Sequence, residues 1–408
     1  MPRQGYGYGP VTRSSAASAA SDLQGGVLMR NRAASGKRKE EEHIADGGVK
    51  KGRAAFGDLT NQSQGKASQF SAKESEGSRG SFHGAQQQAP QVEARQHLHY
   101  ALREFQRPAD MELESAAVAD NHWIDIDSLD HDDPMACTEY VHDIVCHLLE
   151  AEMKRRPCVN YMEAVQQDAN AHMRGILVDW LVEVAQEYKL VSETLFLAVN
   201  YIDRFLSCEV SPRRKLQLVG ITCMLIAAKY EEIYAPQIED FCYITDNTYS
   251  REEVIAMEQQ ILGALSFELT VPTAKTFLRR FLKAAMPSDV PADARLEFLS
   301  SYLAELMLPE YRALQFRPSQ IAASAVMLAN LTLGRPAWTP TLQYYTGYSP
   351  CDIMACCKLM HKLHAGQHKP AAATPAIRDK YSQPRFYCVS SLAAATSSQV
   401  SCLDDQSW

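Results

Sequence analysis

The sequence predicts an all-α protein that contains a duplicated helical domain. Apolar residues recur at helical spacing in successive segments between about residues 171 and 365, and no segment shows the alternation of a half-buried strand. Short stretches also recur in the same order at a nearly constant spacing. Ile176–Leu181 matches Phe277–Leu282 and Tyr201-Ile202 matches Tyr302-Leu303, both at a spacing of 101 residues; Gln217–Gly220 matches Gln320–Ala323 at 103, and Val254–Ala256 matches Ile353–Ala355 at 99.

Length, charge and cysteine usage narrow the class of protein. A chain of 408 residues is long enough for two to three domains, and its net charge of −8 argues against nucleic acid as a partner. Eleven cysteines without a CxxC pair favour neither a disulfide framework nor a zinc ribbon. Residues 1–30 lack a signal-peptide core, and the longest apolar run, Leu218–Ala228, is shorter than the ~20 residues of a membrane span. We expect a soluble intracellular protein with no membrane partner.

Residues 1–95 are predicted to form a disordered tail. They are rich in Ser, Ala, Gly and Gln and contain no Trp, so they cannot bury enough apolar surface to offset their ordering entropy. The basic clusters Lys37–Lys39 and Lys50–Arg53 suit a nuclear-import signal or a solvated charge run equally well. Arg53–Asn61 sets one aromatic and one aliphatic residue between an Arg and an Asn, which is typical of a short docking motif.

Residues 96–170 are predicted to hold a linker and an N-terminal helix. Trp123 lies in an acidic stretch and is a candidate anchor at the domain edge. Between Cys137 and Met153 the apolar residues follow a helical period, and Pro157 prevents continuation. These apolar residues are Tyr140, Ile144, Leu148 and Leu149. We expect an isolated helix that packs as a lid or joins an interface.

The segment Met173–Tyr188 is predicted to be a central helix. Apolar residues cover two of its faces, so it belongs inside a helical domain. One face holds Met173, Ile176, Leu177, Trp180 and Val184, the other holds Val178, Leu181, Val182 and Ala185, and the polar sector holds Asp179, Glu183 and Gln186. Arg174 lies on the buried side, where an ion persists only if it is paired. We expect Asp203 of the next helix to be its partner.

The helices that follow are predicted at Glu193–Ser207, Arg213–Lys229, Pro236–Tyr243 and Arg251–Leu265. Small residues such as Gly220 and Ala322 indicate that the third helix of each copy is the close-packed centre. After residue 365 the composition changes to a linker, and the apolar residues of 376–390 suit a segment that folds back on the core. We expect the remaining residues to fray.

The two copies differ at two charged positions. Glu258 interrupts an apolar stripe, and its counterpart is Cys357 (258 plus 99). Lys229 ends the third helix, and its counterpart is Thr332 (229 plus 103). A Lys at a helix C-terminus compensates the helix dipole, which explains Lys229, and Glu258 could lie at the edge of the apolar stripe. Neither explanation accounts for the loss of both charges in the second copy. The pair therefore suits a surface that orients a partner helix.

Four stretches closely resemble the cyclin box of A-type cyclins, and most of all the plant A-type group. They read M-R-G-I-L-V-D-W-L-V-E-V, Y-I-D-R-F-L-S, K-L-Q-L-V-G-I-T-C-M-L-I-A-A-K-Y-E-E-I and F-C-Y-I-T-D-N-T-Y. The resemblance implies two tandem five-helix cyclin folds, at 171–268 and 269–365, with a C-terminal tail at 366–408. It implies no catalytic activity and no cofactor of the chain itself. It implies instead a regulatory subunit that binds and activates a cyclin-dependent Ser/Thr protein kinase and controls cell-cycle progression.

The resemblance also assigns roles to individual residues. Kinase binding falls on Lys229, Glu258, Phe267, Leu269, Tyr140 and Ile144. A hydrophobic groove for Arg-x-Leu motifs in substrates and inhibitors falls on Met173, Ile176, Leu177, Trp180, Glu183 and Gln217. Arg53, Phe56 and Asn61 match the destruction box of mitotic cyclins, which implies timed proteolysis by a ubiquitin ligase that reads the tail. The expected location is the nucleus, with the cytoplasm.

Two other classes of function remain open from the residues. A transcription adaptor on the same duplicated fold would be expected to carry a zinc ribbon and a basic surface, and the sequence shows neither. An enzyme could use His361, His364 and Cys357 as metal ligands, although their spacing is also that of an ordinary helix face.

Overall fold

The computed structural model describes residues 123–286, 293–366 and 375–405, all within one compact unit of the chain. These residues form helices and loops and contain no strand. The predicted tail, with its basic clusters and the destruction-box-like residues Arg53, Phe56 and Asn61, lies outside the described residues. Within the described ranges, no helix combines the length and apolar character needed to cross a bilayer.

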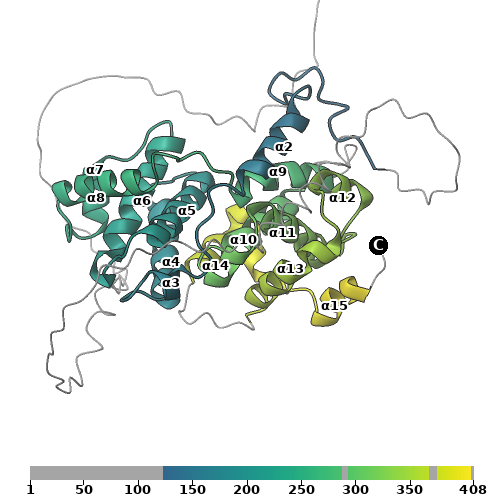
Figure 1. The fold of residues 1–408 in the computed structure, drawn as a ribbon. Helices are drawn as coiled ribbons and strands as arrows, with labels where there is room; N and C mark the ends of the chain where they lie inside the picture. The colour runs from purple at the N-terminus through teal and green to yellow at the C-terminus, as the bar shows by residue number, and fades with distance from the viewer. Residues whose placement is uncertain (1–122, 287–292, 367–374, 406–408) are drawn as a thin grey trace, which may run out of the picture. The chain divides into compact units, whose positions relative to one another are not determined.

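The two predicted five-helix repeats are confirmed within the described residues. The first repeat, teal in Figure 1, consists of α4 (Ala171–Glu187), α5 (Ser192–Cys208), α6 (Leu216–Glu231), α7 (Ile238–Ile244) and α8 (Arg251–Ala264). The second repeat, green in Figure 1, consists of α9 (Ala274–Ala285), α10 (Ala294–Leu306), α11 (Pro318–Thr332), α12 (Pro340–Thr346) and α13 (Pro350–His364). Short 3-10 turns precede the third helix of each repeat, η2 (Arg213–Lys215) and η3 (Tyr311–Gln315).

Side-chain caps fix where several of these helices begin. The Asn170 side chain accepts a hydrogen bond from the Met173 amide at 3.0 Å and starts α4. Ser250 and Glu253 form a reciprocal capping box at the start of α8. Thr273 caps α9 in the same way, directly after the segment that joins the two repeats. These caps satisfy backbone amides that have no partner within the first turn of each helix.

The third helix of each repeat is the packed centre, as predicted. From Leu218 to Ala228 every residue of α6 is buried, and so is every residue of α11 from Ala322 to Asn330. The helices α4 and α6 touch closely at Gly220, where an added Cβ would lie 2.8 Å from Leu177 Cδ1. A hydrogen in place of a side chain therefore lets the two helix backbones approach.

The helix α2 (Val141–Ala151) is not isolated, which corrects the expectation from the sequence. Its C-cap residue Glu152 is buried and accepts hydrogen bonds from Ser319 N at 2.9 Å and Ser319 Oγ at 2.7 Å. Arg156 donates to the carbonyls of Leu314 and Phe316 at 2.8 and 2.9 Å. The short helix α3 (Tyr161–Ala164) then leads into the first repeat. These polar contacts across about 160 residues tie α2 to the second repeat.

Trp123 anchors the segment before α2, as predicted. Its ring stacks on Tyr344 with centroids 4.0 Å apart. Four residues later, Asp127 accepts from Arg280 at 2.6 Å and from Lys283 at 2.9 Å. The partners lie on α9 and α12, so this segment runs along the second repeat.

The C-terminal segment packs back onto both repeats. In α14 (Ala376–Tyr381), Ile377 and Tyr381 are buried, and the Asp179 side chain of α4 accepts from the Ala376 amide at 3.0 Å. Two 3-10 turns follow, η4 (Pro384–Phe386) and η5 (Val389–Ser391), and then α15 (Ser397–Asp405). The expected fraying after residue 390 is wrong, because α15 packs on α13 and Val400 is buried.

Candidate functional site

The charged pair that distinguishes the first repeat lies at the solvent boundary of α6 and α8. Lys229 Nζ and Glu258 Oε1 are 2.6 Å apart, and 48% of the Lys229 side chain and 16% of the Glu258 side chain are exposed. An ammonium group has three donors, and Glu258 occupies one of them. The pair is thus preformed, and Lys229 keeps donors free for an incoming group.

A strained turn directly after α8, the helix that carries Glu258, contains Phe267. Ser266 and Phe267 have φ values of +53° and +58°, in the left-handed region that non-glycine residues seldom adopt. Their amides bond to the Gly263 and Leu262 carbonyls at 3.0 Å, which holds the turn in place. The Phe267 side chain remains 72% exposed. Local strain combined with an exposed aromatic ring is typical of a functional position.

Arg155 joins α2 to the same turn. Its guanidinium donates to both carboxylate oxygens of Glu268, at 2.7 and 3.0 Å. Arg204 of α5 also donates to the Glu268 carbonyl at 2.9 Å. Of the predicted kinase-binding residues on α2, Tyr140 and Ile144 are both exposed, whereas Leu269 of the turn is half-buried. Hydrogen bonds of Arg155 and Arg204 thus connect the end of α2 and α5 to the turn after α8, and these segments lie near the predicted kinase-binding residues in the sequence.

Sequence reasoning missed three exposed apolar residues at the end of α6. Tyr230 is exposed, and its hydroxyl lies 2.8 Å from Thr270 Oγ1 in the turn after α8. Ile233 and Tyr234 are the most exposed large apolar residues among those described, at 90% and 91%. Ile233 and Tyr234 follow the end of α6 at Glu231, so two adjacent apolar residues just past a helix end were the available signal. We call Lys229, Glu258, Phe267, Tyr230, Ile233 and Tyr234 the Lys229 surface.

The predicted groove residues lie on α4 and α6 and differ in exposure. Met173, Ile176, Trp180 and Gln217 are half-buried, and Glu183 is exposed. Leu177 is fully buried, and its contact with a ligand stays a prediction. Its side chain lies against the α6 backbone at Gly220, where it forms part of the core below the other residues.

The predicted ion pair beneath these surfaces forms in the structure. Arg174 donates to the two Asp203 oxygens at 2.6 and 2.7 Å and to the Leu308 carbonyl at 2.8 Å. Tyr161 donates to Asp203 at 2.8 Å, and burial raises the pKa of this hydroxyl. The pair joins α4 to α5 and to the loop before η3 of the second repeat.

Asp179 does not belong to a solvated polar sector, which corrects the expectation for α4. It is only 8% exposed and caps the start of α14 through the Ala376 amide. Burial raises the pKa of this carboxyl to about 7. The contact spans 197 residues, so no local pattern in the sequence indicates it.

The histidines near the end of the second repeat serve packing. His361 Nε2 lies 2.7 Å from the Ala395 carbonyl. His364 is buried against the Tyr302 ring, and burial lowers its pKa to about 4. Within the described residues no three His, Cys, Asp or Glu side chains are grouped so that they could hold a metal ion.

Comparison with known proteins gives matches over both repeats. The family model for the cyclin N-terminal domain matches residues 143–270, and that for the cyclin C-terminal domain matches residues 272–395. Cyclin-A1-1 of Oryza sativa subsp. japonica is 49% identical over 68% of this chain and 53% of its own length. Cyclin-A3-1 of the same organism is 52% identical over 64% of this chain and 70% of its own length.

The chain thus spans about half the length of the first of these relatives, with 53% covered. Among solved structures, a viral cyclin from herpesvirus saimiri is 20% identical, with a TM-score of 0.49, over 54% of this chain and 96% of that chain.

Proposed function

Because the chain belongs to the cyclin family, in its plant A-type group, we propose that it is a regulatory subunit that binds and activates a cyclin-dependent Ser/Thr protein kinase. The observation that supports this most directly is the Lys229–Glu258 pair, which is preformed at 2.6 Å and still open to solvent. In this role the chain does no catalysis and needs no cofactor. It acts by holding a helix of the kinase in place.

The Lys229 surface has the composition that such docking needs. Protein kinases become active when a Lys–Glu pair that involves their αC helix is assembled. Exposed aromatic and aliphatic side chains supply the area that a docked helix can bury, and here they lie on the segments directly after α6 and α8, the helices that carry the two opposite charges. The charges then fix the orientation of the helix, since complementarity sets register more than affinity.

Substrate docking is the second part of the proposal. Met173, Ile176, Trp180 and Gln217 offer a half-buried apolar surface on α4 and α6, with the exposed Glu183 beside it. A leucine of an Arg-x-Leu motif would contact the apolar residues, and its arginine would pair with Glu183. Substrates and inhibitors that carry this motif would thereby be held near the kinase.

Timed removal of the protein is the third part. The motif of Arg53, Phe56 and Asn61 lies outside the described residues, and its resemblance to a destruction box supports recognition by a ubiquitin ligase. The basic clusters of the same region support a nuclear location, with the cytoplasm.

The test is the double variant Lys229→Ala with Glu258→Ala. We expect kinase affinity to fall by roughly 100-fold or more, because both partners of an oriented charge pair are lost. Kinase binding is measured by calorimetry with cyclin-dependent kinases of a plant cell, and activation by phosphate transfer to a short peptide. Circular dichroism should show an unchanged fold.

The matched control is Arg251→Ala with Glu239→Ala. This pair joins α8 to α7 of the same repeat at 3.0 Å and is exposed on both sides. It should leave binding and activation unchanged. Full activation by the Lys229 and Glu258 double variant would reject the proposed surface.

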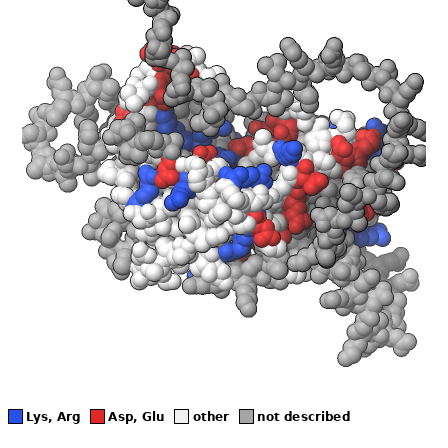
Figure 2. Space-filling view, turned by 180° about the vertical axis from the view of Figure 1, so that it is seen from behind, with Lys and Arg blue, Asp and Glu red and all other residues white. Residues whose placement is uncertain are grey.

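A transcription adaptor on the same fold is the other candidate. Figure 2 shows a face on which Lys and Arg lie in a row beside groups of Asp and Glu. This mixed pattern differs from the continuous basic footprint of proteins that bind nucleic acid. The observation favours the kinase regulator.

A further inference from the structure

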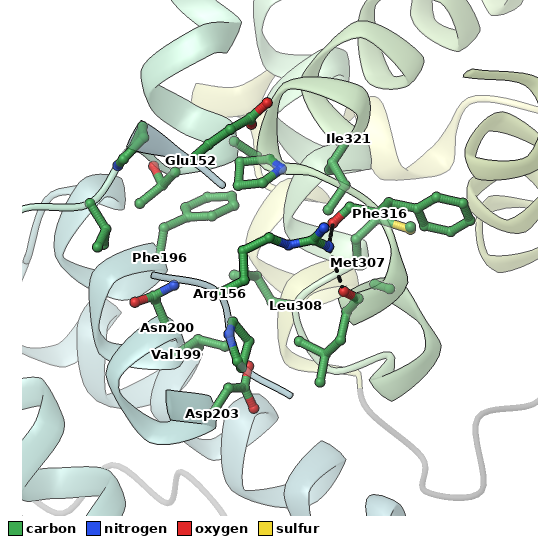
Figure 3. A pocket seen from close by; sticks show the side chains of 18 of the residues that line it. Glu152, Arg156, Phe196, Val199, Asn200, Asp203, Met307, Leu308, Phe316 and Ile321 are labelled. Atoms are coloured by element: carbon green, nitrogen blue, oxygen red, sulfur yellow. Dashed lines mark hydrogen bonds between the residues drawn. The ribbon is translucent and has the colours of Figure 1, made fainter. Parts of the chain in front are cut away.

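Two cavities of the molecule border both repeats, and they differ in how their cationic groups are satisfied. The smaller one, of about 110 Å³, lies where the end of α2 meets both repeats (Figure 3). Its three arginines all have partners within the chain: Arg174 pairs with Asp203, Arg155 with Glu268, and Arg156 with two backbone carbonyls. An anion that entered this cavity would have to displace one of these partners.

The larger cavity, of about 380 Å³, lies where the end of α4 and the start of α5 meet α9, α10 and α14. Four cationic side chains line it, and they come from four segments: Lys189 after α4, Lys275 on α9, Lys380 on α14 and Arg385 in η4. Among the described residues of its wall, Glu297 of α10 is the one carboxylate. The wall therefore carries an excess of positive charge. Neither proposed role uses this cavity.

Lys380 is the one of these four cations that has a carboxylate partner in the described part of the chain. It donates to both oxygens of Glu305 at 2.8 Å. Glu305 is 1% exposed and also accepts from Tyr381 at 2.8 Å, so this carboxylate is fully engaged behind the wall. The charge of Lys380 is thereby neutralised by its own chain.

The other three cations have no ion pair within the described ranges. Lys275 Nζ lies 3.2 Å from Ser301 Oγ, a neutral group of the same wall. The Arg385 guanidinium lies over the ring of Phe386, 4.7 Å from its centroid, and this ring also lines the cavity. Lys189 is exposed. All three therefore keep donors for an incoming acceptor.

A neighbouring carboxylate, Glu193 of α5, does not cancel this excess. Burial raises the pKa of Glu193, and the nearby charges of Lys275 and Arg279 offset part of that rise. Glu193 thus adds one negative charge to the surroundings of Lys275, and Arg279 adds one positive charge. The balance at the cavity stays positive.

A strained turn follows directly after the aromatic side of the wall. Tyr387 and Cys388 have φ values of +54° and +52°, in the left-handed region that non-glycine residues seldom adopt. The Tyr387 ring stacks on Phe298 of the wall with centroids 5.9 Å apart and remains 53% exposed. Such strain clusters at sites that bind ligands, so it is a second and independent feature of this place.

We propose that this cavity binds a phosphate group that carries two negative charges, on a phosphorylated side chain or as free phosphate. A phosphate group has three strong acceptor oxygens, which matches the three cations that have no ion pair. Lys189, Lys275 and Arg385 donate charge-assisted hydrogen bonds to it. A carboxylate has one charge and two oxygens and engages fewer of these donors, and Glu297 repels it as well.

The test uses the full chain without kinase at about pH 8, where a phosphate monoester is fully ionised. The probe is a labelled five-residue peptide with one phosphoserine between alanines, and its binding is measured by fluorescence anisotropy. We expect it to bind roughly ten-fold or more tightly than the same peptide with glutamate in place of phosphoserine, and the serine peptide to bind least.

Inorganic phosphate as a competitor separates the two sources of the group. Displacement of the labelled peptide at similar concentrations of phosphate and unlabelled phosphopeptide assigns free phosphate. Displacement that needs far more inorganic phosphate assigns a phosphorylated segment of a protein. Both results support the site.

Lys189→Gln with Lys275→Gln tests the residues of the wall. We expect the affinity for the phosphopeptide to fall by about ten-fold or more, because two charged donors are lost. Lys154→Gln with Lys362→Gln is the matched control, since both lysines are exposed, the net charge changes equally and neither residue lines the cavity. Circular dichroism checks the fold of both proteins.

Glu297→Gln tests the site in the opposite direction. Removal of the one carboxylate in the wall should tighten phosphopeptide binding about three-fold, which is a gain that a loss of folding cannot produce. Four results would each overturn the proposal: no binding to the natural sequence, equal binding of the glutamate peptide, equal affinities in the two lysine double variants, or weaker binding by Glu297→Gln. Since no kinase is present, none of these results bears on kinase activation.

Discussion

The two repeats carry opposite charges at the same point of their second helix. Arg204 of α5 corresponds to Glu305 of α10 (204 plus 101), and both are buried. Arg204 donates to the Glu268 carbonyl, in the segment that follows the first repeat. Glu305 accepts from Lys380 and Tyr381 at 2.8 Å, in the segment that follows the second repeat. At the same position, each repeat therefore binds the segment that follows it. In the first repeat the side chain donates the hydrogen bond, and in the second repeat it accepts.

The repeats also differ in what their outgoing segment covers. The segment after the first repeat is a short turn, and Lys229 and Glu258 stay accessible beside it. The segment after the second repeat includes α15, which packs on α13, and Cys357 on α13 is fully buried. Thr332, the counterpart of Lys229, directs its hydroxyl to the Leu328 carbonyl of its own helix. The charged pair of the first repeat thus stays open to solvent, whereas at the corresponding positions of the second repeat Cys357 is fully buried and Thr332 is half-buried.

The largest difference in stability should come from the buried ion pair, which only the first repeat has. Arg174 and Asp203 correspond to Lys275 and Ala304 (each plus 101). Asp203→Ala leaves Arg174 buried without a carboxylate, and we expect the free energy of unfolding to fall by about 3–5 kcal/mol. Equilibrium unfolding in urea measures this free energy.

Lys275→Ala is the control for that comparison. Lys275 donates to Ser301 Oγ at 3.2 Å and is not paired with a buried carboxylate as Arg174 is, so its loss should cost about 1 kcal/mol or less. If Asp203→Ala and Lys275→Ala lowered the free energy of unfolding equally, the buried ion pair would not distinguish the first repeat from the second.

The next effect should come from the covering segment of the second repeat. Lys380→Ala leaves the Glu305 carboxylate buried with Tyr381 as its main remaining donor, and the free energy of unfolding should fall by about 1.5–3 kcal/mol. Hydrogen exchange in residues 376–391 should become faster. Arg385→Ala removes a cation from the same segment that only stacks on Phe386, and it should change little. Unchanged exchange in Lys380→Ala would show that the ion pair does not hold this segment.

A smaller effect is expected at the proposed groove. Trp180 is half-buried, whereas its counterpart Phe281 (180 plus 101) is fully buried. Trp180→Ala should lower phosphorylation of Arg-x-Leu substrates by roughly ten-fold and leave short peptides without the motif unaffected. Phe281→Leu should change neither. An equal loss for both kinds of substrate would remove the groove from the first repeat.

The smallest effect is a pH dependence at Asp179. Burial raises its pKa to about 7 in the folded protein, well above the value near 4 of an unfolded chain. Between these values the folded state binds the extra proton, so the contribution of Asp179 to stability falls as pH rises from 5 to 7. Asp179→Asn can still accept from the Ala376 amide and should lack this fall. Urea midpoints of the two proteins that shift in parallel over this range would contradict the assignment.

Local patterns in the sequence predicted the helices in which apolar residues recur at helical spacing. The helices, the duplication and the Arg174–Asp203 pair all follow from apolar spacing and from one charge on a buried face. The patterns failed where distant segments meet. Asp179 appeared solvent-exposed because its cap on α14 lies 197 residues away, and Glu152 gave no sign of its contact with Ser319. The burial of Leu177 depends on a missing side chain in another helix.

That missing side chain sets the depth of the proposed groove. A methyl group at position 220 would collide with Leu177 Cδ1, and Leu177 would have to change its position on α4, the helix that also carries Ile176 and Trp180. The proposed groove would then be shallower, and it would prefer a residue smaller than leucine. In the proposed docking role, position 220 would thus influence which peptides are preferred although it is not one of the proposed groove residues.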